Sequence, residues 1–300
     1  VSFKAQAANT LTFSGAVTAG TFGTAATPNV THGTLLLSST LTAPEVNVMS
    51  AGTGNATFTG AVNATTSFAY SAFGNNTATI NNLTSPIINL TTNSTSGSAL
   101  TLAGAVNGFT TLNITNGGTG TVTVSNSAAA NLTGTGASTV NLTQNSTGTI
   151  TVGGATGGAI AGANTALNIN FTGLSGVGGT VNLNASNTFG GATSITGGTT
   201  NLGYATTNTS KLADAAALTL NRAVLNITGP ASAGHTEIVG SLAIGTGASS
   251  ITRTASTTGT LQAGAITRII GGVLNLGENS IVTTNNTNTN AILGGWATVA

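Results

Sequence analysis

No Asp, Glu, Lys, Arg or His occurs between Val46 and Ser210, a run of 165 residues. General acid–base catalysis needs a titratable side chain within reach of the substrate, and in this run only Tyr70 and Tyr204 titrate. Zinc and calcium sites need thiolates, imidazoles or carboxylates. The run therefore excludes most enzymatic chemistry from more than half of the chain. We expect no catalytic, cofactor-binding or metal-binding residues in this protein.

The composition limits the kind of core that the chain can build. Hydrophobic residues make up 39% of the sequence, but aromatic residues only 4%. Because a globular core obtains much of its buried area from large side chains, this chain needs many small, repeated contacts instead. A net charge of +1 provides no basic surface for nucleic acid, and weak repulsion between copies favours association. There is no cysteine for disulfides, and no apolar run long enough for a transmembrane helix.

Apolar residues recur in pairs, each pair enclosing one polar residue, at intervals of roughly ten residues, with turn-forming glycines between them. The pairs are Ile88/Leu90, Leu100/Leu102, Leu112/Ile114, Val122/Val124, Val140/Leu142 and Ile150/Val152. Such alternation, rich in β-branched residues, is typical of half-buried strands. Helical periodicity is absent, and 43 glycines would be costly in helices. The sequence therefore predicts an all-β protein.

Evenly spaced short strands are compatible with a sandwich, a barrel or a solenoid. A sandwich core needs larger side chains than these pairs supply, and a transmembrane barrel needs aromatic girdles that 12 aromatic residues do not provide. A parallel β-solenoid stacks small residues in ladders, so it suits this chain best. With about 20 to 30 residues in a turn, we expect about 10 to 15 turns and a rod of about 50–70 Å.

Three segments of one continuous solenoid are expected. Residues 1–79 hold six of the nine Phe residues and predict a thicker core or a junction. Residues 80–186 carry the regular short strands. Residues 187–300 form the third segment, in which the character of the sequence changes.

The third segment resembles the autotransporter-associated β-strand repeat. The resemblance rests on Asn187–Ile195 running into Gly198–Gly203, on Thr236–Leu242, on Ile266–Arg268 and on the closing segment Asn290–Val299. Thr200 departs from the pattern, because Leu is usual there, so that turn should bury less apolar surface. The resemblance implies a right-handed parallel β-helix in a large bacterial protein that is secreted or attached to the cell surface. It brings no catalytic residues.

Few residues could carry chemistry. Asp214 and Glu237 could meet on neighbouring turns, with Arg222 beside them, but a solvated ion pair is the favoured interpretation. Arg253 and Arg268 follow matching Ile-Thr pairs, which favours a structural role at equivalent strand ends. His32 and His235 are isolated, and Trp296 is expected to pack within the closing motif. Triplets such as Asn113-Ile114-Thr115 are explained by strand alternation, with the apolar residue inward.

The leading functional hypothesis is a non-enzymatic structural or adhesive protein at the bacterial cell surface or outside the cell. It would form a rod segment of a fibre, sheath or autotransporter passenger. Its partner would be itself, either as another copy in an end-to-end filament or as further repeats of the same chain. The alternative is a carbohydrate-binding or carbohydrate-active β-helix module, with a host or matrix polysaccharide as partner. A third possibility is ice binding, suggested by Thr121-Val122-Thr123 and Thr149-Ile150-Thr151, but the irregular spacing of such Thr pairs along the chain counts against it.

Overall fold

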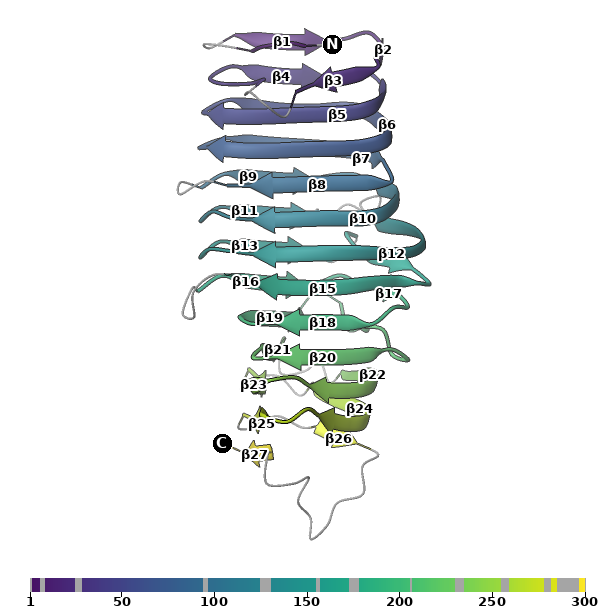
Figure 1. Ribbon diagram of the computed structural model, residues 1–300, viewed down its shortest axis with the longest axis vertical. Coiled ribbons are helices and arrows are strands. Elements are labelled where there is room, and N and C mark those ends of the chain that lie inside the picture. Colours follow the sequence, from purple (N-terminus) through teal and green to yellow (C-terminus); the bar gives the residue numbers. More distant parts are fainter. Residues whose placement is uncertain are drawn as a thin grey trace.

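The computed structural model is a stack of parallel β-strands, a β-solenoid of about ten turns (Figure 1). All strand pairings among the described residues are parallel, and these residues contain no helix. The prediction of an all-β solenoid is therefore confirmed. The structure describes residues 2–5, 9–24, 29–93, 97–124, 131–154, 157–172, 178–205, 207–229, 235–254, 259–277, 282–284 and 297–299.

The strands are short, except where one strand continues around a corner of the solenoid. In the first half of the chain they are β1 (Thr10–Phe13), β2 (Val17–Thr18), β3 (Thr21–Gly23), β4 (Thr34–Leu37), β5 (Leu41–Gly52), β6 (Asn55–Gly74), β7 (Thr77–Thr84), β8 (Ile87–Thr92), β9 (Ala99–Leu102), β10 (Val106–Asn116), β11 (Thr121–Val124), β12 (Leu132–Gln144) and β13 (Thr149–Val152). In the second half they are β14 (Ile160–Gly162), β15 (Thr165–Phe171), β16 (Thr180–Leu183), β17 (Thr188–Phe189), β18 (Thr193–Thr196), β19 (Thr199–Gly203), β20 (Ala217–Asn221), β21 (Val224–Thr228), β22 (Thr236–Ile244), β23 (Gly247–Arg253), β24 (Thr260–Arg268), β25 (Gly272–Leu276), β26 (Val282–Thr284) and β27 (Ala297–Val299).

Three parallel sheets enclose the core. The first, the threonine face, contains β4, the first parts of β6 and β7, then β9, β11, β13, β16, β19, β21, β23 and β25. The second, the asparagine face, contains the last parts of β5 and β6, then β8, the last parts of β10 and β12, and β15, β18 and β20. A third, narrower sheet joins them along the remaining side. Register shifts at Ala43/Glu45 and Phe58/Ala61 mark corners between sheets.

The core follows directly from the predicted alternation. On each coil the two apolar residues of a pair point inward and are fully buried, as Leu112 and Ile114 are on β10 and Val122 and Val124 on β11. The apolar residues of all coils form one continuous cluster along the rod. Each strand buries little apolar area by itself. Because apolar residues of neighbouring coils stack on one another, these small contacts add up along the axis of the rod.

Outward asparagines form hydrogen-bonded ladders between coils. The amide of Asn113 donates to Asn89 at 2.8 Å, Asn141 donates to Asn113 at 2.7 Å, and Asn168 donates to Asn141 at 2.9 Å. A second ladder on the threonine face joins Asn226 to Asn201 and Asn201 to Asn182. Four of these residues, Asn89, Asn113, Asn141 and Asn226, belong to Asn-x-Thr triplets, whose apolar middle residue is buried, as the alternation predicts. Side-chain ladders of this kind favour flat, little-twisted sheets.

The aromatic residues of the first segment occupy two places. Phe58, Phe68 and Tyr70 are fully buried in the core of the early coils. Nearer the N-terminus, the rings of Phe3, Phe13 and Phe22 lie 4.7 to 5.7 Å apart, centroid to centroid. Phe22 is buried, but Phe3 and Phe13 are only partly covered. This half-open aromatic group lies at the end of the stack beside β1.

Candidate functional site

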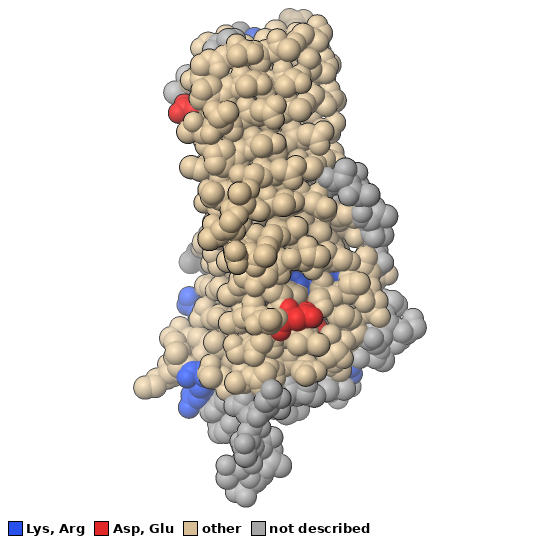
Figure 2. Space-filling view, turned by 90° about the vertical axis from the view of Figure 1, so that its right-hand side faces the viewer, with Lys and Arg blue, Asp and Glu red and all other residues tan. Residues whose placement is uncertain are grey.

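The charged residues are distributed very unevenly along the rod. Figure 2 shows that the middle of the rod carries no charged atoms in that view, and that most red and blue atoms lie in its lower half. Of the described carboxylates, Glu45 and Asp214 are exposed and Glu237 is completely buried. Because a buried carboxylate must find compensating partners, the surroundings of Glu237 form the candidate site.

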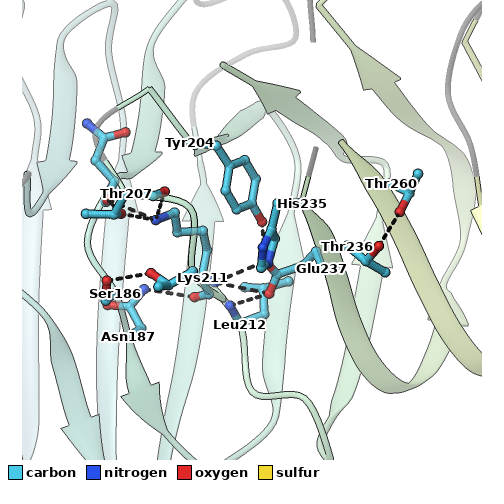
Figure 3. Close-up of polar contacts among 12 residues, drawn as sticks. Ser186, Asn187, Tyr204, Thr207, Lys211, Leu212, His235, Thr236, Glu237 and Thr260 are labelled. Carbon is cyan, nitrogen blue, oxygen red and sulfur yellow. Dashed lines mark hydrogen bonds and ion pairs between the residues drawn. The ribbon is translucent and has the colours of Figure 1, made fainter. Parts of the chain in front are cut away.

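The site lies where the third sheet is interrupted. In that sheet β14 pairs with β17, but the next coil passes through a loop between β19 and β20, and a strand returns only with β22. Lys211 and Leu212 lie on this loop, between Asn187 just before β17 and Glu237 within β22 (Figure 3). Asn187 and Lys211 are 24 residues apart, and Lys211 and Glu237 are 26 residues apart. The site thus stacks one residue from each of three consecutive coils.

Side chains supply the hydrogen bonds that a strand would make in this position. Lys211 donates its backbone N–H to both oxygens of Glu237, at 3.1 and 3.0 Å, and Leu212 donates its N–H to one of them at 2.7 Å. On the other side, the amide of Asn187 donates to the Lys211 carbonyl oxygen at 2.8 Å. The Asn187 side-chain oxygen accepts from the Ile160 N–H at 2.9 Å. The loop is therefore held in register although it contains no strand.

The ammonium group of Lys211 points away from Glu237. Its Nζ donates to the carbonyl oxygens of Asn184 and Thr207, both at 3.1 Å, and to the Thr207 hydroxyl. It also lies 5.0 Å from the centre of the Tyr204 ring, within the range of a cation–π contact. Burial lowers the pKa of Lys211 from 10.5 to about 8, and the charge of Glu237 opposes this shift. Lys211 thus joins its loop to the preceding coil through Asn184, and to another part of the same loop through Thr207.

Tyr204 and His235 complete the surroundings of the carboxylate. The Tyr204 hydroxyl donates to Glu237, and the His235 ring stacks on the Tyr204 ring with centroids 4.8 Å apart. His235 Nε2 lies 3.7 Å from a Glu237 oxygen. Burial raises the pKa of Glu237, partly offset by the hydrogen bonds from Tyr204, Lys211 and Leu212. Burial and the charge of Lys211 lower the pKa of His235.

This group of residues is closed to solvent. Both oxygens of Glu237 accept from groups of the chain, and Tyr204, Lys211 and Glu237 are at most 2% exposed. A general acid or base must reach the proton of a substrate, and this carboxylate faces the interior of the solenoid. The geometry therefore supports a structural role for this group of residues: it is a buried polar clamp whose hydrogen bonds join three coils.

The structure places the candidate residues differently from the sequence expectation. The expectation of a solvated ion pair among Asp214, Glu237 and Arg222 on the loop after Leu212 is wrong for Glu237, because this carboxylate is buried within the clamp. Asp214 is exposed on the same loop, and its charge contributes to raising the pKa of Glu237. Arg222 lies in the turn between β20 and β21, exposed, with a positive φ of 51°. Sequence reasoning missed Lys211 and Tyr204; the 26-residue separation of Lys211 from Glu237, one solenoid turn, is the signal that could have found the lysine.

The remaining candidates have local roles. Arg253 Nη1 donates to the Gly259 carbonyl at 3.1 Å, and Arg268 Nη1 to the Gly272 carbonyl at 3.2 Å. Both arginines end strands, but β23 belongs to the threonine face and β24 continues the asparagine face, so the two ends are not equivalent. His32 Nδ1 lies 3.4 Å from the Thr53 hydroxyl. Trp296 lies outside the described residues, and among the residues described no three acidic or histidine side chains are placed to hold a metal ion.

No family model, curated protein or solved structure matches this chain. The resemblance of residues 187–300 to the autotransporter-associated repeat therefore stays a prediction. Thr200, where that resemblance breaks, is fully buried between two apolar neighbours. Within the described ranges, no helix is both long and apolar enough to cross a membrane.

Proposed function

We propose that this chain is a segment of a non-enzymatic structural rod at the bacterial cell surface or outside the cell, and that it joins end to end with further coils. The observation that supports this most directly is the open end of the stack at β1. There β1 pairs with β4 on one side only, among the residues described.

The backbone of β1 has N–H and C=O groups that could pair with another strand. The carbonyl oxygen of Asn9 accepts a hydrogen bond from Thr34 of β4, and that of Phe13 accepts one from Ser38, the residue directly after β4. In a parallel ladder alternate residues bond to opposite sides, so Thr10 and Thr12 direct their N–H and C=O groups away from β4. A row of such unpaired groups is a template for another strand.

The core is also open at this end. Phe3, Leu11, Phe13, Val17 and Ala19 pack against the core but remain partly exposed. Covering partly exposed apolar side chains with a further coil would bury them at about 25 cal/mol for each Å². The partner that fits both the edge and the apolar end is another parallel coil, from the same long chain or from another copy.

The charge distribution supports a mechanical role over a catalytic one. Glycoside hydrolysis needs two carboxylates that flank one bond, and the buried clamp leaves Glu237 without access to solvent. A nearly uncharged exterior also makes a rod insensitive to salt. Incubation of the protein with neutral and acidic polysaccharides, scored for chain cleavage, is expected to show none; cleavage would favour the carbohydrate-active alternative.

End-to-end joining is tested with an edge substitution. Thr12→Pro removes an N–H that points away from β4, and proline is tolerated on edge strands. Electron microscopy and sedimentation of the 300-residue chain should show rods several molecules long for the wild type and single rods for Thr12→Pro. Thr12→Ala keeps the N–H and is the matched control. Wild-type protein that stays monomeric at high concentration, or a Thr12→Pro variant that still joins, would contradict the proposal.

A further inference from the structure

The outward side chains of the threonine face form a two-dimensional array. In six strands of this sheet, two outward residues are separated by one inward apolar or small residue. In the six consecutive strands β7, β9, β11, β13, β16 and β19, the outward pairs are Thr77/Thr79, Ala99/Thr101, Thr121/Thr123, Thr149/Thr151, Thr180/Asn182 and Thr199/Asn201. Nine of these twelve positions are threonine, and two of the other three are asparagine.

The array is regular although its spacing along the chain is not. Thr121 lies beside Thr149 and Thr123 beside Thr151 in the register of β11 and β13, and the same two columns continue into β16. Stacked partners on this face are from 19 to 31 residues apart in the sequence. The loops between the strands differ in length, and this accounts for the different numbers of residues between stacked partners. The irregular spacing of the Thr pairs along the sequence counted against a threonine array. That inference is wrong, because the pairs are in register in the structure.

The dimensions of the array follow from strand geometry. Neighbouring coils are about 4.8 Å apart, and alternate residues of one strand are about 6.7 Å apart. The face is thus a nearly rectangular net of methyl and hydroxyl groups. Within the described part of the chain, the hydroxyls of Thr79, Thr101 and Thr123 have no protein partner, so they are available to water. All six strands fall within the run that contains no charged residue.

We propose that the threonine face binds ice. Hexagonal ice repeats its water sites on the prism face in two perpendicular directions, with spacings close to those of this net. Each hydroxyl can occupy the place of a lattice water, and each methyl can lie in the hollow between lattice waters. A charged group would orient water against that lattice, and the six strands of the array have none. A protein partner is less suited to the face, because its outward residues are small and provide no apolar anchor of the kind that dominates protein interfaces.

Occupation of the face by ice is independent of end-to-end joining, because β1 lies at one end of the rod and the strands that carry the array follow one another along its length (Figure 1). Failure of one proposal therefore leaves the other standing.

Thermal hysteresis and adsorption into a growing ice crystal test the inference. The wild-type chain should separate the freezing and melting points and produce faceted crystals. Thr123→Lys places a charge at the centre of the array and should lose most of the hysteresis. Thr115→Lys is the matched control, because Thr115 is a half-buried outward threonine on the asparagine face of the same coil; it should retain the hysteresis. Circular dichroism at the same temperature checks that both variants are folded.

Thr123→Val keeps the methyl groups and the shape, so it should weaken the hysteresis less than Thr123→Lys does. Absence of hysteresis in the wild type at any accessible concentration would overturn the inference. Equal loss in Thr115→Lys and Thr123→Lys would do the same. Retention of the wild type on a crystalline polysaccharide without any effect on ice would also overturn it, and would assign the face to a sugar lattice.

Discussion

The backbone N–H of Lys211 donates to both carboxylate oxygens of Glu237, at 3.1 and 3.0 Å, while the ammonium group of the same lysine turns away to other partners. The two residues thus form a backbone-to-side-chain contact and no ion pair. Glu237 replaces the backbone acceptor that a neighbouring strand would offer. In one coil of the third sheet the described residues form a loop in place of a strand, and the clamp supplies hydrogen bonds that the missing strand would make.

Replacing the carboxylate should change the acid dependence of stability. Because the pKa of Glu237 is raised above 4.5 in the folded protein, the unfolded chain ionises first as the pH rises, and the wild type then loses stability until the folded carboxyl group ionises as well. Glu237→Gln lacks this loss, which is about 1.4 kcal/mol for each unit of the pKa difference. Urea unfolding followed by circular dichroism from pH 3.5 upward should show the variant gaining stability relative to the wild type. Parallel profiles would refute the assignment.

Removing the ammonium group should weaken the clamp and remove an alkaline transition. Lys211→Met leaves the carbonyl oxygens of Asn184 and Thr207 without this donor, at a cost of about 1–3 kcal/mol. In the wild type the folded pKa of about 8 lies below the unfolded value of 10.5, so the unfolded state binds more protons and stability rises with pH between these values. The variant should lack this rise. The measurement is denaturant unfolding at pH 7, 9 and 10.5, and a rise that persists in Lys211→Met would rule out Lys211 as its source.

Replacing the buried hydroxyl group of Thr200 by a methyl group should increase the stability of the protein. Thr200 packs between Val181 and Leu225, is fully buried, and its hydroxyl has no hydrogen-bond partner among the described residues. Thr200→Val keeps the shape and removes the desolvation penalty, so we expect stabilisation of about 1–2 kcal/mol. Thr199→Val, on the outward neighbour, is the control and should change stability by less than about 0.5 kcal/mol. A lower melting temperature for Thr200→Val would count against this account of the site.

Two adjacent glycines should respond differently to alanine. A Cβ on Gly179 would lie 2.1 Å from the Ser146 carbonyl oxygen, whereas a Cβ on Gly178 would meet nothing within 4 Å. Gly179→Ala forces neighbouring coils apart and should cost about 1–3 kcal/mol, while Gly178→Ala should be neutral or slightly stabilising. Thermal unfolding of the two variants measures the difference. Equal effects would mean that the coils can separate at this corner without strain.

Much of the fold was predictable because it depends on local alternation. The apolar pairs from Ile88 to Val152 are inward on their strands, and no distant contact was needed to infer this. The expectation that Thr200 buries less apolar surface than the usual Leu depends on the family resemblance and not on alternation; the structure buries Thr200 between Val181 and Leu225. The candidate site was not predictable in the same way, because alternation does not tell which residues of the preceding coil meet Glu237. Asp214 of that coil was expected beside it, whereas Lys211 and Leu212 make the contacts.

Alternation of small apolar and polar residues over a charge-free run determined by itself that this chain forms short strands and which residues of each strand face the core, because burial on a strand depends only on residues two apart. The tertiary structure alone decided which residues stack from coil to coil, because loops of different length lie between them. That registration brought Lys211 and Tyr204 to Glu237, and it aligned Thr121 with Thr149.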